Sequence, residues 1–98
     1  MQQVLIAGQW RDANSNESFQ ASNPATREPL ANEYPVSTWE DCDAALTSAA
    51  EAAVGLRSIT GAQIAEFLEA YATEIENNAD AIVDMAHAET AYPKPTRL

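Results

Sequence analysis

Apolar side chains between Thr60 and Ala88 recur with the spacing of one helical face, and this pattern constrains the fold more than any other. Large apolar residues occupy positions i, i+3, i+4 and i+7, while glutamates occupy the opposite face. Thr60, followed three residues later by Gln63, forms a capping box that predicts where the helix begins. Because a helix with one apolar stripe must bury it, the chain requires a covering surface. The stripe consists of Ile64, Phe67, Leu68, Tyr71, Ala72 and Ile75.

Two further helices are predicted on either side of this one. The periodic pattern is interrupted at Asn77-Asn78 and resumes in a shorter helix from Ala79. An earlier helix is predicted to begin at a capping box from Ser37 to Glu40 and to stop at Gly55. The apolar stripe of this helix is nearly all alanine, so another element can approach it closely. The stripe consists of Cys42, Ala45, Leu46, Ala49, Ala50 and Ala53. After the last helix, prolines in the segment 92–95 predict that the helix cannot continue.

The N-terminal third has the composition of short strands. Residues 4–6 are β-prone, and Gly8 supplies a tight turn into Trp10-Arg11. Residues 18–22 and 29–36 are two more extended segments, separated by a turn at residues 23–26. The predicted class is therefore α+β, with short antiparallel strands followed by three helices. We divide it into a strand segment at 1–36, a three-helix segment at 37–91 and a Pro-containing tail at 92–98, which form one domain or subdomain overall.

Size and charge exclude several classes of function. A chain of 98 residues builds one modest core at most. Its net charge of -10 and its pI near 4.2 exclude nucleic acid and anionic membranes as partners. Cys42 is the single cysteine, so no internal disulfide can form, which fits a reducing compartment. Since no stretch approaches the length of a membrane span, the expected location is the cytoplasm.

The side chains capable of chemistry do not form a catalytic pattern. Cys42 lies near a predicted helix N-terminus, which favours a thiolate, but the flanking Asp41 and Asp43 disfavour it. His87 and Asp84 share a helical face, yet a carboxylate metal site in a helical bundle needs a second such pair. There is no glycine-rich phosphate loop, HExxH or CxxC motif. We therefore assign no catalytic, cofactor-binding or metal-binding residue.

The order of short motifs nevertheless resembles the aldehyde dehydrogenase family. Residues 6–12 (IAGQWRD) resemble its "I-x-G-x-W" opening, and Phe19 with residues 23–28 (NPATRE) resembles its "F…NPATGE" turn. The helix start at 40–45 and the helix junction at 75–80 are also similar to the family pattern. Glu89-Thr90, Pro93 and Arg97-Leu98 look most like the branch that oxidises α-ketoglutaric semialdehyde (2,5-dioxopentanoate). Arg27 departs from the family, which usually has glycine there, so a positive φ is expected at this residue.

The resemblance implies an N-terminal lead-in to an aldehyde dehydrogenase fold, without its Rossmann core. The complete enzyme would oxidise an aldehyde to an acid through a cysteine thiohemiacetal, with NAD(P) accepting hydride. The family's catalytic cysteine, general-base glutamate and cofactor loop lie downstream of this region, so the chain is expected to be catalytically silent and to bind no cofactor. The alternative is a self-standing acidic α+β interaction module.

The expected partners follow from the apolar stripe. We expect self-association through exposed helix faces, or docking on the remainder of a dehydrogenase chain where that is present. The residues assigned to this association interface are Ile64, Phe67, Leu68, Tyr71 and Ile75.

Overall fold

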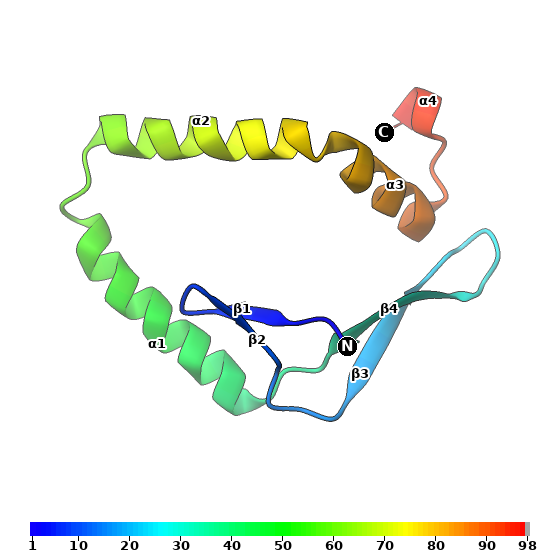
Figure 1. Ribbon diagram of the computed structural model, residues 1–98, viewed down its shortest axis with the longest axis horizontal. Helices are drawn as coiled ribbons and strands as arrows, with labels where there is room; N and C mark the ends of the chain where they lie inside the picture. Colours follow the sequence, from blue (N-terminus) through cyan, green and yellow to red (C-terminus); the bar gives the residue numbers. More distant parts are fainter. Residues whose placement is uncertain (98) are drawn as a thin grey trace. The chain divides into compact units, whose positions relative to one another are not determined.

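Short antiparallel strands precede the helices, which confirms the predicted α+β class (Figure 1). The computed structural model describes the backbone of residues 1–97 and the side chains of residues 1–95. Leu98, the last residue of the predicted tail, lies outside the described residues. The elements are β1 (Val4–Ile6), β2 (Gln9–Arg11), β3 (Ser18–Ser22), β4 (Pro29–Pro35), α1 (Trp39–Leu56), α2 (Gly61–Asn77), α3 (Ala79–Thr90) and α4 (Lys94–Arg97).

The contacts within the chain divide it into two compact units. The first unit contains residues 1–21 and 29–58, and therefore holds the strands and α1. The second unit contains the loop at residues 22–28 together with the chain from Ile59 onward, and therefore holds α2, α3 and α4.

A tight hairpin opens the first unit. β1 and β2 pair in antiparallel register, with Leu5 opposite Trp10 and Ile6 opposite Gln9. The two connecting residues, Ala7 and Gly8, have φ angles of 53° and 76°. Positive φ at both central residues is the signature of a type I′ turn, whose twist matches that of the flanking strands. α1 lies beside β1 in this unit.

A backbone hydrogen bond joins the second pair of strands to the residues that precede β1. β3 and β4 form their own two-stranded sheet, and their six-residue connection is too short for a parallel crossover. The Gln2 backbone N–H donates to the Glu33 carbonyl at 2.7 Å, which ties the start of the chain to β4. The rings of Phe19 and Tyr34 lie 5.6 Å apart across β3 and β4. Leu30 and Tyr34 of β4 are half-buried.

The two ends of α1 differ from the sequence-based expectation. The N-cap is Thr38 rather than Ser37, because the Asp41 backbone N–H donates to the Thr38 hydroxyl oxygen. The predicted capping box is therefore wrong by one residue. Gly55 does not stop the helix, which runs through Leu56 to a C-cap at Arg57 with a right-handed φ of -65°. A helix can end on such a residue when its N–H bonds back to the last carbonyls, so no left-handed glycine is required.

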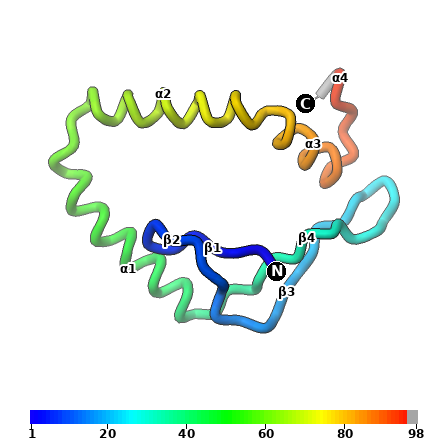
Figure 2. Tube along the Cα trace, in the orientation of Figure 1, coloured from blue at the N-terminus to red at the C-terminus, as the bar shows by residue number. Residues whose placement is uncertain are grey.

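The predicted capping box of α2 is confirmed. The Thr60 hydroxyl oxygen accepts from the Gln63 backbone N–H, and the Gln63 side chain accepts from the Thr60 backbone N–H. Asn78 then ends α2 and begins α3, and the chain changes direction there (Figure 2). Its side-chain amide donates to the Glu74 carbonyl at 2.8 Å, which satisfies one of the free carbonyls at the end of α2.

The tail contains a turn that the sequence analysis did not predict. α3 ends at Thr90, and Ala91 takes a left-handed φ of 57° as its C-cap. Lys94 and Pro95 then belong to the one-turn α4. The expectation that this segment leaves the helix is correct for α3, but proline is also well suited to the first turn of a new helix because that turn's N–H groups are unpaired.

The turn after β3 is held by hydrogen bonds between its own residues. The Asn23 side-chain oxygen accepts from the Ala25 N–H at 2.9 Å, and the Asn23 carbonyl accepts from the Arg27 N–H at 2.7 Å. The expected turn at residues 23–26 is therefore present. Arg27 has a φ of 64°, which confirms the left-handed conformation expected from the glycine usual at this position.

Replacing Arg27 by Gly should stabilise the protein by about 0.5–1 kcal/mol, because a left-handed backbone strains any residue with a Cβ. The matched control is Arg57→Gly, which removes the same charge from an exposed residue with right-handed φ. That control should be neutral or destabilising. Thermal unfolding followed by circular dichroism measures both, and equal changes in the two variants would contradict strain at Arg27.

Candidate functional site: a buried carboxylate and an exposed helical stripe

The most buried side chain among residues 1–95 is a carboxylate, that of Asp41 at 2% exposure. One of its oxygens accepts from the Arg11 guanidinium at 2.7 Å, and the other accepts from the Asn14 backbone N–H at 2.8 Å. Beside it, the Asn14 side-chain amide donates to Glu40 at 2.5 Å. We call this group of Arg11, Asn14, Thr38, Glu40 and Asp41 the polar clasp. It joins β2, the loop after β2 and the first turn of α1.

The environment of Asp41 favours its charged form. The hydrogen bond from the Asn14 backbone is the main cause that lowers the pKa of Asp41 below its usual value, and the Arg11 side chain adds to it. The acid also lies in the first turn of α1, where the helix dipole stabilises negative charge. These contacts hold the carboxylate ionised and fully hydrogen-bonded. The Thr38 hydroxyl caps α1 and the Asp41 carboxylate is engaged by Arg11 and Asn14, so the clasp holds the start of α1 against β2 and the loop after it.

His87 and Asp84 do not form a site together. The His87 Nδ1 atom lies 2.7 Å from the Tyr92 carbonyl oxygen, and because a carbonyl only accepts, Nδ1 carries a proton. Asp84 instead pairs with Lys94, whose hydrogen bond is the main cause that lowers the Asp84 pKa. In the described part of the chain, no group of three or more His, Cys, Asp or Glu side chains is placed to hold a metal ion.

Cys42 lies at the start of α1 and is exposed. The predicted stripe of α1 does not match the burial that the structure shows, because Cys42 and Leu46 are exposed while Asp41 and Ser48 are the covered residues of this helix. The reason is the polar clasp, which turns the Asp41 side of the helix inward.

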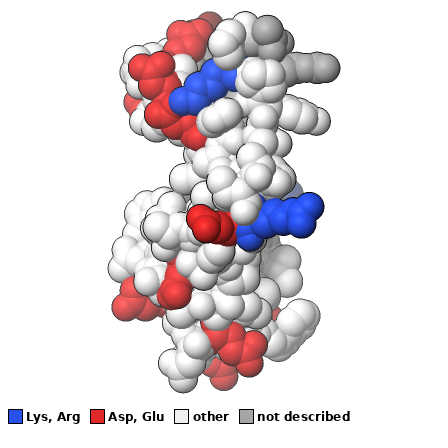
Figure 3. Space-filling view, turned by 90° about the vertical axis from the view of Figure 1, so that its right-hand side faces the viewer, with Lys and Arg blue, Asp and Glu red and all other residues white. Residues whose placement is uncertain are grey.

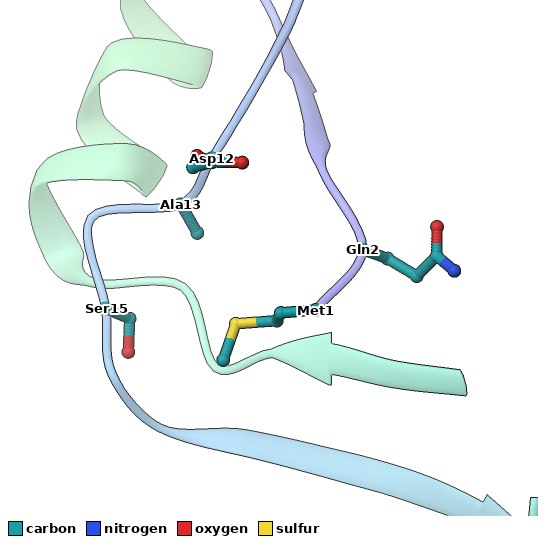
Figure 4. Close-up of a pocket in the computed structure, with 5 residues that line it drawn as sticks. All are labelled: Met1, Gln2, Asp12, Ala13 and Ser15. Atoms are coloured by element: carbon teal, nitrogen blue, oxygen red, sulfur yellow. The ribbon is translucent and has the colours of Figure 1, made fainter. Parts of the chain in front are cut away.

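A small hollow of about 320 Å³ lies between the N-terminus and the loop after β2 (Figure 4). Its walls are Met1, Gln2, Asp12, Ala13 and Ser15, and the Gln2 side chain points away from the others. Asp12 is its charged residue and accepts from the Gln3 amide, while the Ser15 hydroxyl oxygen accepts from the Glu17 N–H. These side chains supply no pairing of a nucleophile with a base, so the hollow lacks the arrangement that acyl or hydride chemistry requires.

The residues assigned to the association interface are exposed on α2. Their exposed fractions run from 46% to 67%, and the rings of Phe67 and Tyr71 stack with centroids 6.2 Å apart. Large apolar side chains are also exposed on the hairpin, where Leu5 and Trp10 face the same side. Among residues 1–95, no apolar side chain is fully buried. The surface drawn in Figure 3 shows acidic groups more often than basic ones.

The described residues thus combine short strands with amphipathic helices whose apolar faces are exposed. The aldehyde dehydrogenase family model matches residues 10–96. The chain therefore belongs to the aldehyde dehydrogenase family.

Individual relatives agree with this assignment. The chain is 32% identical over 91 residues to succinate-semialdehyde dehydrogenase [NADP(+)] 2 of Schizosaccharomyces pombe, covering 93% of this chain and 18% of that relative. It is 31% identical to the D-glyceraldehyde dehydrogenase (NADP(+)) of Picrophilus torridus, with the same coverage. It is 30% identical to the alpha-ketoglutaric semialdehyde dehydrogenase of Bacillus subtilis, covering 93% of this chain and 19% of that relative. The chain thus spans about a fifth of the length of these relatives.

Two further findings concern solved structures and membrane-spanning helices. No solved structure matches the chain significantly. None of the described helices is both long enough and apolar enough to cross a membrane.

The contacts of the polar clasp were not predicted from the sequence. Arg11 and Asp41 are 30 residues apart, so no helical or strand period connects them. The available signal was weaker: an aspartate in the first turn of a helix and an arginine that follows Trp10 at the end of a short strand.

Replacing Asp41 by Asn should lower the melting temperature at pH 7, because an amide cannot accept both hydrogen bonds as a carboxylate does. The folded pKa lies below the usual value of 3.8, so the unfolded chain binds more protons in acid. The stabilisation is therefore present above about pH 4 and lost as the pH falls through the folded pKa.

Melting curves of the wild type and Asp41→Asn between about pH 3 and pH 7 test this. Their difference should be largest at neutral pH and should shrink in acid. Asp43→Asn, which changes an exposed acid two residues away, is the control and should follow the wild type. A difference that stays constant with pH would contradict the clasp.

Proposed function

We propose that this chain is the N-terminal segment of an NADP-dependent dehydrogenase that oxidises a semialdehyde to the corresponding acid. The observation that carries the proposal is a family match over residues 10–96 in a chain that spans about a fifth of its relatives. Two of these relatives are named for semialdehydes, and two names include NADP. α-Ketoglutaric semialdehyde is the proposed substrate, on the motif residues at 89–98 and the Bacillus subtilis relative, and the cytoplasm is the proposed location.

In this role the segment contributes structure rather than chemistry. The polar clasp fixes the hairpin to α1 within the first unit. α2 offers an apolar surface that is available to pack on the remainder of the enzyme. The groups that bind NADP and attack the aldehyde belong to the part of the family fold downstream of this segment.

A self-standing interaction module is the second candidate function, and the observation that favours it is the same exposed stripe on α2. Reading the coding DNA beyond Leu98 separates the two candidates. A frame that continues into a glycine-rich loop and a catalytic cysteine supports the dehydrogenase segment. A stop codon at that point supports the module.

The purified chain should neither bind NADP nor oxidise semialdehydes, because no phosphate-binding loop or paired nucleophile and base is present in its sequence. Isothermal calorimetry with NADP and an absorbance assay for NADPH test this. Saturable binding at micromolar NADP would contradict the assignment of the cofactor site to the remainder of the enzyme. An aldehyde dehydrogenase of full length serves as the positive control.

We also propose that the isolated chain associates with itself through α2, since no other cover for the stripe is then available. Burying a large apolar side chain gains about 1.5–3 kcal/mol, whereas repulsion between exposed charges is screened beyond about 8–10 Å. Association should therefore tighten as salt rises.

Phe67→Glu should shift the isolated chain to monomer, as measured by light scattering over a range of salt concentrations. Ala62→Glu adds the same charge on the opposite side of α2 and is the control, which should associate as the wild type does. A folded monomer at high concentration and high salt would show that the stripe is not an association surface.

A further inference from the structure

The charges at the two ends of α2 oppose its helix dipole. The last turn carries Glu74 and Glu76 and no basic residue, while the first turn carries no acid. Both glutamates are exposed, one along each edge of the stripe. Because the dipole is positive at the N-terminus and negative at the C-terminus, each glutamate lies at the end of its own helix that disfavours negative charge. The first turn lacks the negative charge that the dipole favours there.

The surface at the start of α2 is open and presents hydrogen-bond donors. A Cβ placed on Gly61 would meet no other part of the chain within 4 Å. The Gln63 side-chain oxygen accepts from the Thr60 N–H, so the amide nitrogen is the donor end of that side chain. The first N–H groups of a helix have no partner within the helix. A carboxylate brought to this turn would therefore meet donors and the positive end of the dipole.

The two ways of pairing α2 with a second copy differ in what the glutamates meet. When the stripes face each other in parallel, the last turns lie side by side, and Glu74 of one copy is opposite Glu76 of the other along both edges. In an antiparallel pair, the last turn of each copy lies beside the first turn of the other. Glu74 is then opposite Gln63, and Glu76 is opposite Gly61.

We propose that the isolated chain forms an antiparallel dimer, in which the α2 stripes of two copies face each other about a two-fold axis at the middle of the helix. The spacing of the stripe is the same from either end, so this axis sets Ile64 opposite Ile75. It also brings the stacked rings of Phe67 and Tyr71 against their counterparts. A two-fold interface of this kind closes at the dimer. The inference rests on the self-association proposed above and is independent of the dehydrogenase assignment.

Charge reversal in the last turn separates the two orientations. Glu76→Lys and its control Glu66→Lys change the net charge equally, but Glu66 lies on the face of α2 opposite the stripe. Lysine near the C-terminus of a helix favours the dipole of that helix, so weaker association of Glu76→Lys cannot come from a weaker α2. Sedimentation equilibrium of the purified chain in about 0.1 M NaCl gives the dimer dissociation constant, and circular dichroism gives the helix content.

The antiparallel dimer predicts a dissociation constant at least about threefold higher for Glu76→Lys than for Glu66→Lys, because the introduced ammonium group meets the positive end of the other helix twice in each dimer. In a parallel dimer the same group would pair with Glu74 of the other copy, and Glu76→Lys would associate more tightly than the control. Tighter association, or equal dissociation constants, would overturn the proposal.

Cross-linking provides a second measurement that does not depend on charge. Ile64→Cys and Ile75→Cys are each made with Cys42→Ser, which removes the natural exposed thiol, and are mixed with a short bifunctional maleimide. The antiparallel dimer predicts products that join unlike variants, whereas a predominance of products that join like variants would overturn it. A chain that stays monomeric at every concentration would overturn the self-association itself. The dehydrogenase assignment is tested separately by the coding DNA beyond Leu98.

Discussion

A single carboxylate organises the first unit of this protein. β1 and β2 have three residues each, and strands of that length are not stable as an isolated pair. Asp41 joins them to α1 by accepting from the Arg11 guanidinium and the Asn14 backbone, while its own N–H donates to Thr38. Because the carboxylate is excluded from water, loss of either partner would leave one of its two oxygens without that hydrogen bond, which is costly for a buried charge. The position of α1 beside the hairpin thus depends on polar contacts rather than on an apolar core.

The helices of the second unit differ from the first unit, because they expose the apolar side chains whose packing normally stabilises a helix. In proteins most helical stability comes from packing of the apolar face, and this holds for a helix of 17 residues such as α2. The capping box and the Asn78 side chain satisfy the ends of α2 locally. They do not replace packing along its length. Under the proposed function, the remainder of the enzyme would supply the surface that covers these apolar faces.

The sequence predicted the local features well and the distant ones poorly. The start of α2 was predictable because a capping box uses two side chains three residues apart, and both hydrogen bonds are present. The positive φ of Arg27 was predictable because the family that the sequence resembles usually has glycine at this position. The N-cap of α1 was misplaced because Ser37 and Thr38 are adjacent residues that can both cap a helix, and it is the Thr38 hydroxyl that accepts from the Asp41 N–H. Gly55 was misread because a glycine permits a left-handed C-cap without requiring one, and here the helix continued past it.

The free energy available from burying the apolar side chains of α2 indicates what this segment would contribute under the proposed function. Five large apolar side chains on α2 are about half exposed, and burying the exposed part would gain on the order of 5 kcal/mol at about 1.5–3 kcal/mol for each whole side chain. The net stability of a typical domain is about 5–15 kcal/mol, so the apolar surface left exposed on this one helix is large on the scale of a domain's stability. The chemistry of the active site depends on groups held in fixed positions, and those positions last only while the domain stays folded. Under the proposed function, this segment would therefore support activity by stabilising the domain rather than by touching the substrate.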